Sequence, residues 1–247
     1  MRRLAKTATL VAALGFAGCD EADTDTCRVG NDGLSLVAIA VDNGEQVRAE
    51  IDIEAGERAG PGAGNPVSLC DKDKLTIAGQ EPTLTVKPDR TVYSVTLPAD
   101  TPRDVSFRIE RDSDDTIEMI VPLPPSFSIT APVGEQEVPR SEDLVLTWDP
   151  PLAMSEIRLN VQEEVGYGVC VETQPGPHDY KSPVGIPVPD TGTWTIPADN
   201  IASMTPDPCR AFYNLRRIQR GPYPETLAAG GFVEGRVERT VEILSVP

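Results

Sequence analysis

The stretch Val47–Glu54 reads VRAEIDIE, and its residues alternate strictly between apolar and charged side chains. Because successive side chains of a β-strand point to opposite faces, this period of two places one set in a core and the other in water. The stretch therefore predicts a half-buried strand, and a strand of this kind needs a second layer to cover its apolar face.

The same alternation recurs through the first half of the chain. The further alternating segments are residues 84–86, 93–97, 105–109 and 117–121. A more continuous apolar run at Leu34–Val41 is typical of a strand covered on both faces. Turn-rich stretches separate these segments, and 24 prolines with 20 glycines favour many short strands over helices. Residues 27–122 are therefore predicted to form a small antiparallel β-sandwich.

A proline-rich joint and a second series of strands follow. Pro122–Pro125 reads PLPP, which stiffens the chain and cannot continue a sheet ladder, so it is predicted to be a semi-rigid domain joint. Strands are predicted around residues 126–129, 144–148, 157–161, 194–196, 209–218 and 236–244. Residues 123–247 are thus predicted to be a second sandwich, with a long irregular excursion at Pro175–Pro189, which is rich in proline and glycine.

Within this second half, Ser126–Pro151 has an apolar opening followed by the pattern Leu-x-Leu-x-Trp-x-Pro, formed by Leu144, Leu146, Trp148 and Pro150. It resembles the first two strands of fibronectin type III and related immunoglobulin-like domains. The resemblance implies that Trp148 fills the centre of the core between two sheets. The predicted fold class is all-β, with two tandem immunoglobulin-like or fibronectin type III-like antiparallel β-sandwiches. Such modules carry many unrelated functions, so the fold alone assigns none.

The N-terminus has the plan of a secretory signal at residues 1–18. A short basic head precedes the apolar run Thr7–Phe16, which is too short for a spanning helix of ~20 residues. Phe16-Ala17-Gly18-Cys19 resembles the lipobox of bacterial lipoproteins. The resemblance implies that Cys19 becomes the lipid-modified, palmitate-carrying first residue of the mature chain. Residues 19–26 would then form an acidic tether, and the protein would sit at the bacterial cell envelope, with the membrane and its face left open.

The charge balance excludes some classes of partner. The chain has a formal net charge of −17, and removal of the three basic residues Arg2, Arg3 and Lys6 takes it to −20. A surface this acidic repels nucleic acids and anionic lipid head groups. The sequence therefore predicts contact with the membrane through the N-terminal lipid, and no nucleic-acid partner.

Four cysteines remain after Cys19 is assigned to lipid. They are Cys27, Cys70, Cys170 and Cys209, an even number in an exported chain, where disulfides form and persist. Four cysteines allow three pairings, and the proline joint leaves two in each half. This division predicts the bridges Cys27–Cys70 and Cys170–Cys209. The alternative is four buried free thiols.

Residues that carry chemistry are few. The one histidine, His178, stands beside Asp179 in a loop, without a Gly-x-Ser-x-Gly nucleophile motif. Zinc-ligand and phosphate-binding motifs are also absent from the sequence, so no catalytic residue, metal or cofactor is predicted. The acidic turns at residues 31–32, 71–73 and 112–115 could converge on calcium. They lack EF-hand spacing, and such residues usually bond their own backbone, so no tight calcium site is expected.

One cluster of basic and aromatic residues runs against the acidic background. Arg210, Phe212, Arg216, Arg217 and Arg220 lie along a single predicted strand and its end. Arginine and aromatic residues are enriched at binding hot spots, which makes these five the candidate partner-binding residues. The alternative, which we favour, is that the arginines pair with acids of neighbouring strands across the sheet and form an ordinary solvated face.

Two functional hypotheses follow from the sequence. The first is a lipid-anchored, non-catalytic module that presents β-sandwiches to a protein or glycan partner at the cell envelope, or acts as a structural spacer. The second is an envelope-associated hydrolase or transferase with an unrecognised site. The scarcity of helical patterns, of histidine and of nucleophile motifs favours the first.

Overall fold

The computed structural model describes residues 25–56, 65–87, 90–113, 115–163, 172–173, 178–198, 201–202 and 207–247. Apart from two short 3-10 helices at Thr26–Arg28 and Asn31–Gly33, the regular elements are β-strands. The all-β prediction is confirmed. Within this part of the chain, no helix has the length and hydrophobicity needed to cross a membrane.

The first sandwich is formed by seven main strands and the two-residue β3. The strands are β1 (Leu34–Asp42), β2 (Gln46–Ala55), β3 (Asn65–Pro66), β4 (Lys74–Ile77), β5 (Thr83–Lys87), β6 (Arg90–Pro98), β7 (Asp104–Glu110) and β8 (Thr116–Pro122). One antiparallel sheet has the order β1-β2-β6-β5, and the other has the order β4-β7-β8. Leaving β3 aside, these are the ABED and CFG sheets of an immunoglobulin constant-type sandwich.

The alternation in β2 decides which side chains enter this core. Val47, Ile51 and Ile53 are fully buried between the sheets, and Arg48 is exposed on the other face, as predicted. Asp52 and Glu54 also lie on the outer face but are buried there, which differs from the prediction that they face water. Residue Glu54 pairs with Pro66 of β3, so a further strand flanks this end of β2.

The second sandwich repeats the two-layer plan. Its strands are β9 (Ser128–Ala131), β10 (Gln136–Pro139), β11 (Leu144–Asp149), β12 (Glu156–Glu163), β14 (Ile186–Pro189), β15 (Thr193–Ile196), β17 (Cys209–Gly221) and β18 (Phe232–Val246), beside the short pair β13 (Glu172–Thr173) and β16 (Ile201–Ala202). The sheet β15-β11-β9 faces the sheet β14-β12-β17-β18, to which β10 adds in parallel. Trp148 is 2% exposed and belongs to the core cluster of this sandwich, as the resemblance implies. The predicted fold class is confirmed.

One strand lies where an irregular excursion was predicted. Ile186–Pro189 forms β14, which pairs with β12 and buries Ile186 and Val188. Pro187 and Pro189 are exposed, and β14 ends the sheet on this side. Proline is tolerated on an edge strand because no ladder bond is needed on its outer side, so a high proline content did not exclude a strand here.

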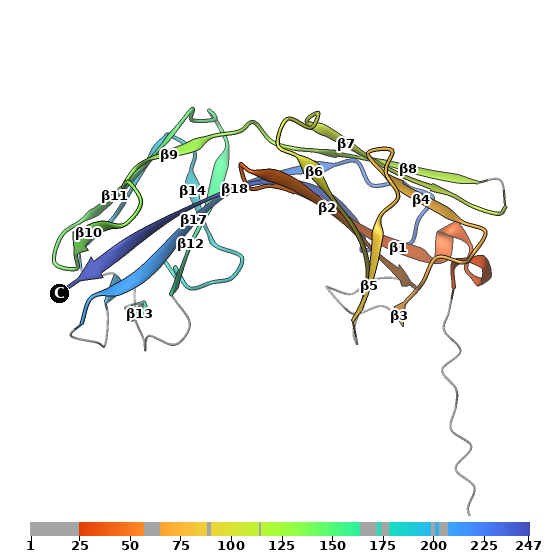
Figure 1. Cartoon of the computed structure of the whole chain (residues 1–247), viewed down its shortest axis with the longest axis horizontal. Coiled ribbons are helices and arrows are strands. Elements are labelled where there is room, and N and C mark those ends of the chain that lie inside the picture. Colours follow the sequence, from red (N-terminus) through yellow and green to blue (C-terminus); the bar gives the residue numbers. More distant parts are fainter. Residues whose placement is uncertain are drawn as a thin grey trace, which may run out of the picture.

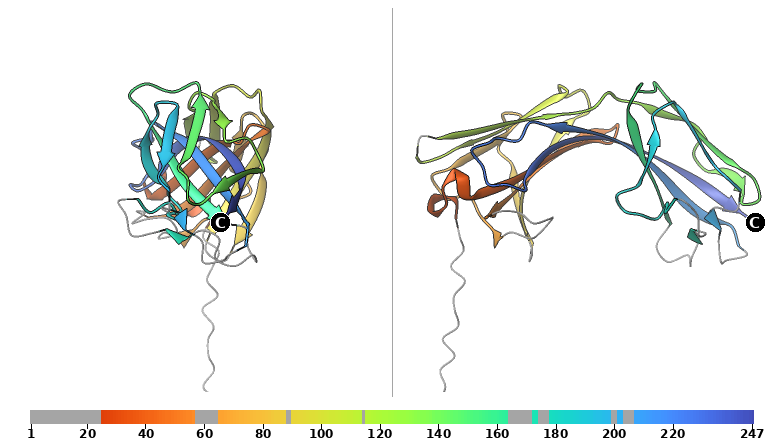
Figure 2. Two further views of the ribbon diagram at one scale, coloured as in Figure 1. Left: turned by 90° about the vertical axis from the view of Figure 1, so that its left-hand side faces the viewer. Right: turned by 180° about the vertical axis from the view of Figure 1, so that it is seen from behind.

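The two sandwiches share one sheet. Strands β17 and β18 form a long hairpin that continues beyond the second sandwich, and residues 37–42 of β1 pair in parallel with residues 232–237 of β18. The main path of the shared sheet is β14-β12-β17-β18-β1-β2-β6-β5. Figure 1 shows an arch in which this sheet lies along the underside of both sandwiches, and Figure 2 shows the same arch from behind.

The crossing hairpin changes the predicted domain division. Leu227 and Val233 pack in the core of the first sandwich, although a division at residue 122 assigns them to the second. A strand of 15 residues such as β18 is ~50 Å long, more than one small sandwich requires. Residues 232–237 of β18 therefore add to the β1 edge of the first sandwich, and residues 27–122 do not form that sandwich alone.

Candidate functional site

The underside of the arch presents the outer face of the shared sheet, here called the concave face. Its central residues are Val37, Ile39 and Val41 of β1, Arg48 and Glu50 of β2, Arg210, Phe212, Arg216 and Arg220 of β17, and Glu234, Arg236, Glu238 and Glu242 of β18. These residues alternate with those that point into the two cores. Four of the five predicted partner-binding residues thus share this face, and Arg217 points into the interior.

The arginines of the concave face are paired with acids of β18. Arg210 lies 2.8 Å from Glu242, Arg216 lies 2.6 Å from Glu238, and Arg220 lies 2.8 Å from Glu234. Arg216 and Glu238, like Arg220 and Glu234, are direct partners in the antiparallel ladder. This arrangement is the alternative stated from the sequence, in which the arginines pair with acids of a neighbouring strand. The pairs Arg210–Glu242 and Arg216–Glu238 are partly exposed, and such pairs contribute ~0–1 kcal/mol each, whereas the Glu234 side chain of the third pair is only 3% exposed.

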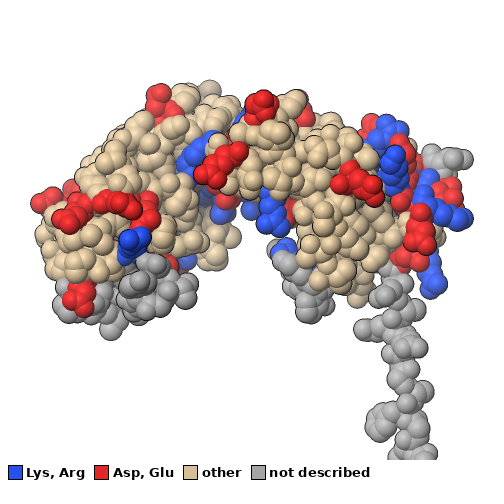
Figure 3. Space-filling model, viewed as in Figure 1, with Lys and Arg blue, Asp and Glu red and all other residues tan. Residues whose placement is uncertain are grey.

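An apolar stripe separates two charged ladders on this face. Val37, Ile39 and Val41 run down the centre, with Glu234 and Arg236 on one side and Arg48 and Glu50 on the other. A depression adjoins the stripe at Val41. It is lined by Val41, Asn43, Gln46, Arg48, Glu50 and Glu238. In Figure 3 basic side chains gather near the middle of the arch and at the outer end of the first sandwich, whereas acidic ones are spread more widely.

Behind the concave face, Arg217 forms a buried ion pair at the junction of the sandwiches. Its Nε lies 2.6 Å and its Nη2 lies 3.0 Å from the two carboxylate oxygens of Asp190, and both side chains are almost completely buried. The Nε1 of Trp148 donates to the same carboxylate at 2.7 Å. The guanidinium also donates to the carbonyls of Pro125 and Pro150 and lies 4.7 Å from the centre of the Phe127 ring. Arg217 is therefore a structural residue, and its assignment as a partner-binding residue is wrong.

A second buried acid, Asp42, holds two further arginines at the junction. Nη1 of Arg103 lies 2.7 Å from its carboxylate, and Nη1 of Arg239 lies 3.2 Å from it. Arg103 also donates to the carbonyl of Pro124, and Arg239 donates to the carbonyl of Phe127 and the hydroxyl of Ser126. We call Arg103, Arg217 and Arg239 with Asp42 and Asp190 the junction clamp. Its three arginines bind the segment 124–127 that connects the sandwiches.

The junction clamp makes stability depend on pH. Burial alone would raise the pKa of Asp42, but the hydrogen bonds from Arg103 and the Gly44 N–H and the charge of Arg239 outweigh it, so its pKa lies below the ordinary 3.8. A carboxyl whose pKa is lower in the folded state stabilises the fold above its unfolded pKa, and this contribution is lost as pH falls through the folded value. We therefore expect Asp42→Asn to lower the unfolding free energy at neutral pH, and the difference from the wild type to shrink below pH ~4. Denaturant titrations between pH 2 and 7 measure this. Asp100→Asn, in an exposed turn, is the control, and an equal pH profile for both variants would contradict the assignment.

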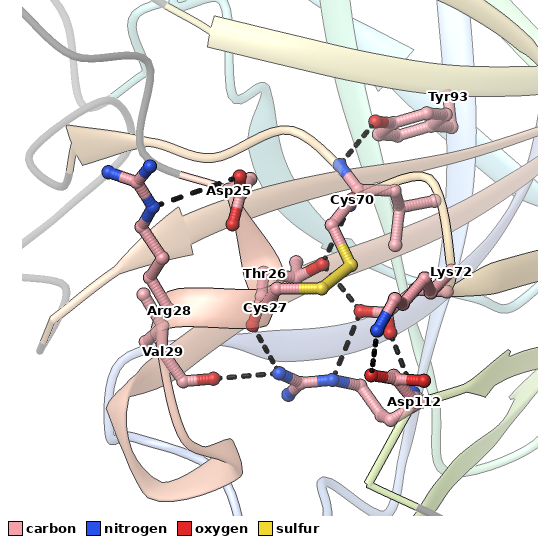
Figure 4. Close-up of a disulfide and its surroundings, with 12 residues drawn as sticks. Asp25, Thr26, Cys27, Arg28, Val29, Cys70, Lys72, Tyr93 and Asp112 are labelled. Carbon is pink, nitrogen blue, oxygen red and sulfur yellow. Dashed lines mark hydrogen bonds and ion pairs between the residues drawn. A yellow bond between two sulfur atoms is a disulfide. The ribbon is translucent and has the colours of Figure 1, made fainter.

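The acidic turns converge at the outer end of the first sandwich, where Arg111 lies between them. Its Nε is 3.2 Å from Asp73, and its Nη1 donates to Asn31 at 2.6 Å. It also donates to the carbonyl of Val29 at 2.7 Å, and the backbone N–H of Asp112 donates to Asp73 at 2.9 Å (Figure 4). Arg111 thus engages side-chain oxygens from two of the three acidic turns, those of Asn31 and Asp73.

The disulfide Cys27–Cys70 lies beside these acidic turns, as Figure 4 shows. This bridge was predicted, and its Cα atoms are 5.7 Å apart. Asp73 lies close to both sulfurs, but the bridge removes the thiolates that a metal would need. Cys209 is also disulfide-bonded. Its predicted partner Cys170 and the lipidation candidate Cys19 lie outside the described residues, so the pairing of Cys209 stays a prediction.

The structure places His178 in an aromatic group. The centre of its ring lies 5.9 Å from the centre of the Tyr180 ring and 5.7 Å from that of Trp194. The neighbouring Asp179 accepts a hydrogen bond from the backbone N–H of Lys181 at 3.1 Å. His178 and Asp179, which are adjacent in sequence, therefore each contact other residues.

The sequence analysis missed the junction clamp apart from Arg217. Asp42 ends a strand and Asp190 follows one, positions where an acid is usually solvated, so composition gave no signal for them. A signal for Arg217 was present. It shares its parity along the strand with Ala211, Tyr213 and Leu215, which all point inward.

Comparison with known proteins gives little beyond this geometry. No family model matches the chain, and no curated protein matches it. Among solved structures it is similar to the crystal structure of the I9-I11 tandem from titin, with 12% sequence identity and a TM-score of 0.21, over 85% of this chain and 66% of that chain. The assignment of the fold therefore rests on the strand order described above.

Proposed function

We propose that this protein is a lipid-anchored component of the bacterial cell envelope that acts as a non-catalytic binding module. Its two β-sandwiches present the concave face to a protein or a glycan. The observation that carries this proposal is the sheet that continues from one sandwich into the other. A shared sheet makes one continuous surface out of two domains, which tandem modules joined by a flexible linker do not offer.

The junction clamp supports the proposal through rigidity. The three arginines donate hydrogen bonds to the connecting segment at residues 124–127, and two of them have buried acids within 3.0 Å. A surface that is already ordered before binding loses less conformational entropy when a partner arrives. The concave face is thus suited to a partner long enough to contact both sandwiches.

The depression beside Val41 is the part of the face where we expect the partner to bind. It combines the apolar side chain of Val41 with the amides of Asn43 and Gln46 and the charged groups of Arg48, Glu50 and Glu238. Small binding sites commonly combine apolar surface with a few polar groups that fix orientation. Both a peptide and a glycan chain can use such a combination.

A matched pair of variants tests this site. Arg48 lies 3.3 Å from Glu50 on the concave face, and Arg108 lies 3.0 Å from Glu110 on β7, in the opposed sheet. We expect Arg48→Ala with Glu50→Ala to weaken binding to solubilised envelope proteins or to purified envelope glycans at least tenfold, a loss of ~1.4 kcal/mol. Arg108→Ala with Glu110→Ala should bind like the wild type. Equal binding by both variants would contradict the placement of the site.

The anchor is tested separately. Cys19→Ser should move the protein from the membrane fraction to the soluble fraction, or leave it unprocessed, because the lipid acceptor is lost. Phe16→Leu, which restores the residue more usual in lipoboxes, should keep the protein in the membrane fraction. Cell fractionation and mass spectrometry of the mature N-terminus measure both. An unmodified N-terminus at a residue other than Cys19 would refute lipid anchoring.

A further inference from the structure

Two arginines lie directly opposite each other on the concave face. Arg158 of β12 and Arg216 of β17 are partners in the antiparallel ladder. Each is flanked in sequence by buried residues, so both side chains point away from the second core. Residues that face each other in this way have Cβ atoms ~5 Å apart. The register of the sheet therefore holds two positive charges side by side.

One of these two charges is paired with an acid and the other is not. The Nε of Arg216 lies 2.6 Å from Glu238. Within the described part of the chain, the guanidinium of Arg158 forms no ion pair or hydrogen bond. Its partners in the sheet are Arg216 on one side and Pro187 on the other, and the nearest acid along its own strand, Glu156, is exposed. Like charges directly opposite each other destabilise a ladder, so an anion between the two guanidiniums would relieve this repulsion.

Neutral polar side chains form the next row of the same face. Asn160 is the ladder partner of Asn214, and Asn214 is the ladder partner of Thr240. The hydroxyl of Thr240 donates to Oδ1 of Asn214 at 2.6 Å, whereas Nδ2 of Asn214 has no acceptor among the described residues. Amides and hydroxyls can both donate to and accept from the hydroxyl groups of a sugar. This row lies two residues, ~7 Å, along the strands from the two arginines.

We propose that this part of the concave face binds an acidic sugar residue. Its oxyanion lies between the guanidiniums of Arg158 and Arg216, and its hydroxyl groups face the row of amides. The fork of N–H donors on a guanidinium matches the oxygens of a carboxylate or a phosphate, so a uronate and a sugar phosphate offer the same recognition chemistry. We call this site the arginine patch, and its residues are Arg158, Asn160, Asn214, Arg216 and Thr240.

The arginine patch adjoins the depression beside Val41, because Glu238 pairs with Arg216 and also lines that depression. One glycan chain can therefore contact both. The proposal rests on the proposed function, since it names an anionic glycan as the partner of the concave face. The net charge of −17 repels anions at long range, so we expect a single acidic sugar to bind with a dissociation constant of about millimolar.

Titration followed by NMR tests the site in the mature chain carrying Cys19→Ser. The probes are glucuronate, glucose 1-phosphate and uncharged glucose, and the signals followed are the Nε–H groups of Arg158 and Arg216. We expect saturable shifts with glucuronate or glucose 1-phosphate and none with glucose, and the tighter of the two acids identifies the source of the oxyanion. No shift with either acid would overturn the proposal. A peptide with two adjacent aspartates that bound more tightly than both would overturn the assignment to a sugar.

Two variants should change the affinity in opposite directions. Arg158→Gln should weaken binding of the acidic sugar by at least about tenfold, because one guanidinium is lost. Glu238→Gln should tighten it by about threefold, because the carboxylate that competes for Arg216 is lost. Loss of folding cannot produce both results. Arg108→Gln, on β7 in the opposed sheet and 49% exposed, is the control and should bind like the parent protein. Unchanged binding by Arg158→Gln, or weaker binding by Glu238→Gln, would overturn the proposal.

The same variants separate this proposal from the proposed function. If Arg158→Gln binds envelope glycans like the parent protein while Arg48→Ala with Glu50→Ala binds them more weakly, the arginine patch is refuted and the site beside Val41 stands. If Arg158→Gln alone weakens binding, the arginine patch stands and the placement of the site beside Val41 is wrong. Without any sugar, Arg158→Gln should resist denaturant at least as well as the parent protein, because the repulsion between the two arginines is removed.

Discussion

Arg217→Met is expected to lower the free energy of unfolding by about 3–5 kcal/mol, because it leaves a buried charge without its partner. Asp190 is 2% exposed, and its carboxylate is held by two guanidinium nitrogens at 2.6 and 3.0 Å. Methionine keeps much of the side-chain volume but removes every donor. The indole N–H of Trp148 would be the remaining hydrogen bond to that carboxylate among the side chains described here. Chemical denaturation at neutral pH measures the change.

Two further variants separate this charge effect from a loss of packing. Arg216→Met, one residue earlier, breaks a pair with Glu238 whose side chains are 22% and 32% exposed, so it should cost less than ~1 kcal/mol. Arg217→Met combined with Asp190→Asn removes the unpaired charge and should recover part of the loss. Equal costs for Arg216→Met and Arg217→Met would show that Asp190 does not depend on its ion pair.

The long alternating segments of the sequence were sufficient to predict the fold class. Period-two patterns such as Val47–Ile53 specify which side chains face a core, and the prolines and glycines between them mark the turns. Leu146 and Trp148 were therefore correctly expected in the second core. The bridge Cys27–Cys70 followed from the division of the chain, because both cysteines lie in the first sandwich.

The shared sheet could not be predicted in the same way. Alternation in β18 shows that Val233, Val237 and Val241 point to one side, but not that Val233 enters the first core and the other two enter the second. Which core receives a side chain depends on the length and path of the hairpin. The junction clamp is hidden for a similar reason, since Asp42 and Arg239 are 197 residues apart in sequence.

The same limit applies to the candidate site. The arginines of β17 were recognisable as a group, but their pairing with acids depends on the register between β17 and β18. The apolar stripe of β1 was recognisable as a strand, but its position in the middle of the concave face depends on the parallel pairing with β18. A sequence pattern gives the face of a strand, and tertiary pairing decides what lies beside it.

The contact between the hairpin and residues 122–123, which lead into the connecting segment, depends on glycine at residue 235. A Cβ placed there would lie 1.9 Å from the carbonyl oxygen of Pro122, 2.6 Å from its carbonyl carbon and 2.9 Å from the Cα of Leu123. These are backbone atoms of the segment that enters the junction, so they cannot turn aside as the end of a flexible side chain can. Gly235 also pairs with Ala40 and Gln219 in the shared sheet, which fixes its own position from both sides.

Gly235→Ala is therefore expected to destabilise the protein by at least about 3 kcal/mol, because either the hairpin or the connecting segment must move. Chemical denaturation measures the loss. Limited proteolysis of the hairpin loop at residues 222–231 distinguishes a detached hairpin from general unfolding. Gly134→Ala is the control, because a Cβ at Gly134 meets nothing within 4 Å, and its cost should stay within about 0.5 kcal/mol. If Gly235→Ala were as stable as Gly134→Ala, the connecting segment would not lie against β18, and the two sandwiches would not be held together by the hairpin that makes their sheets one.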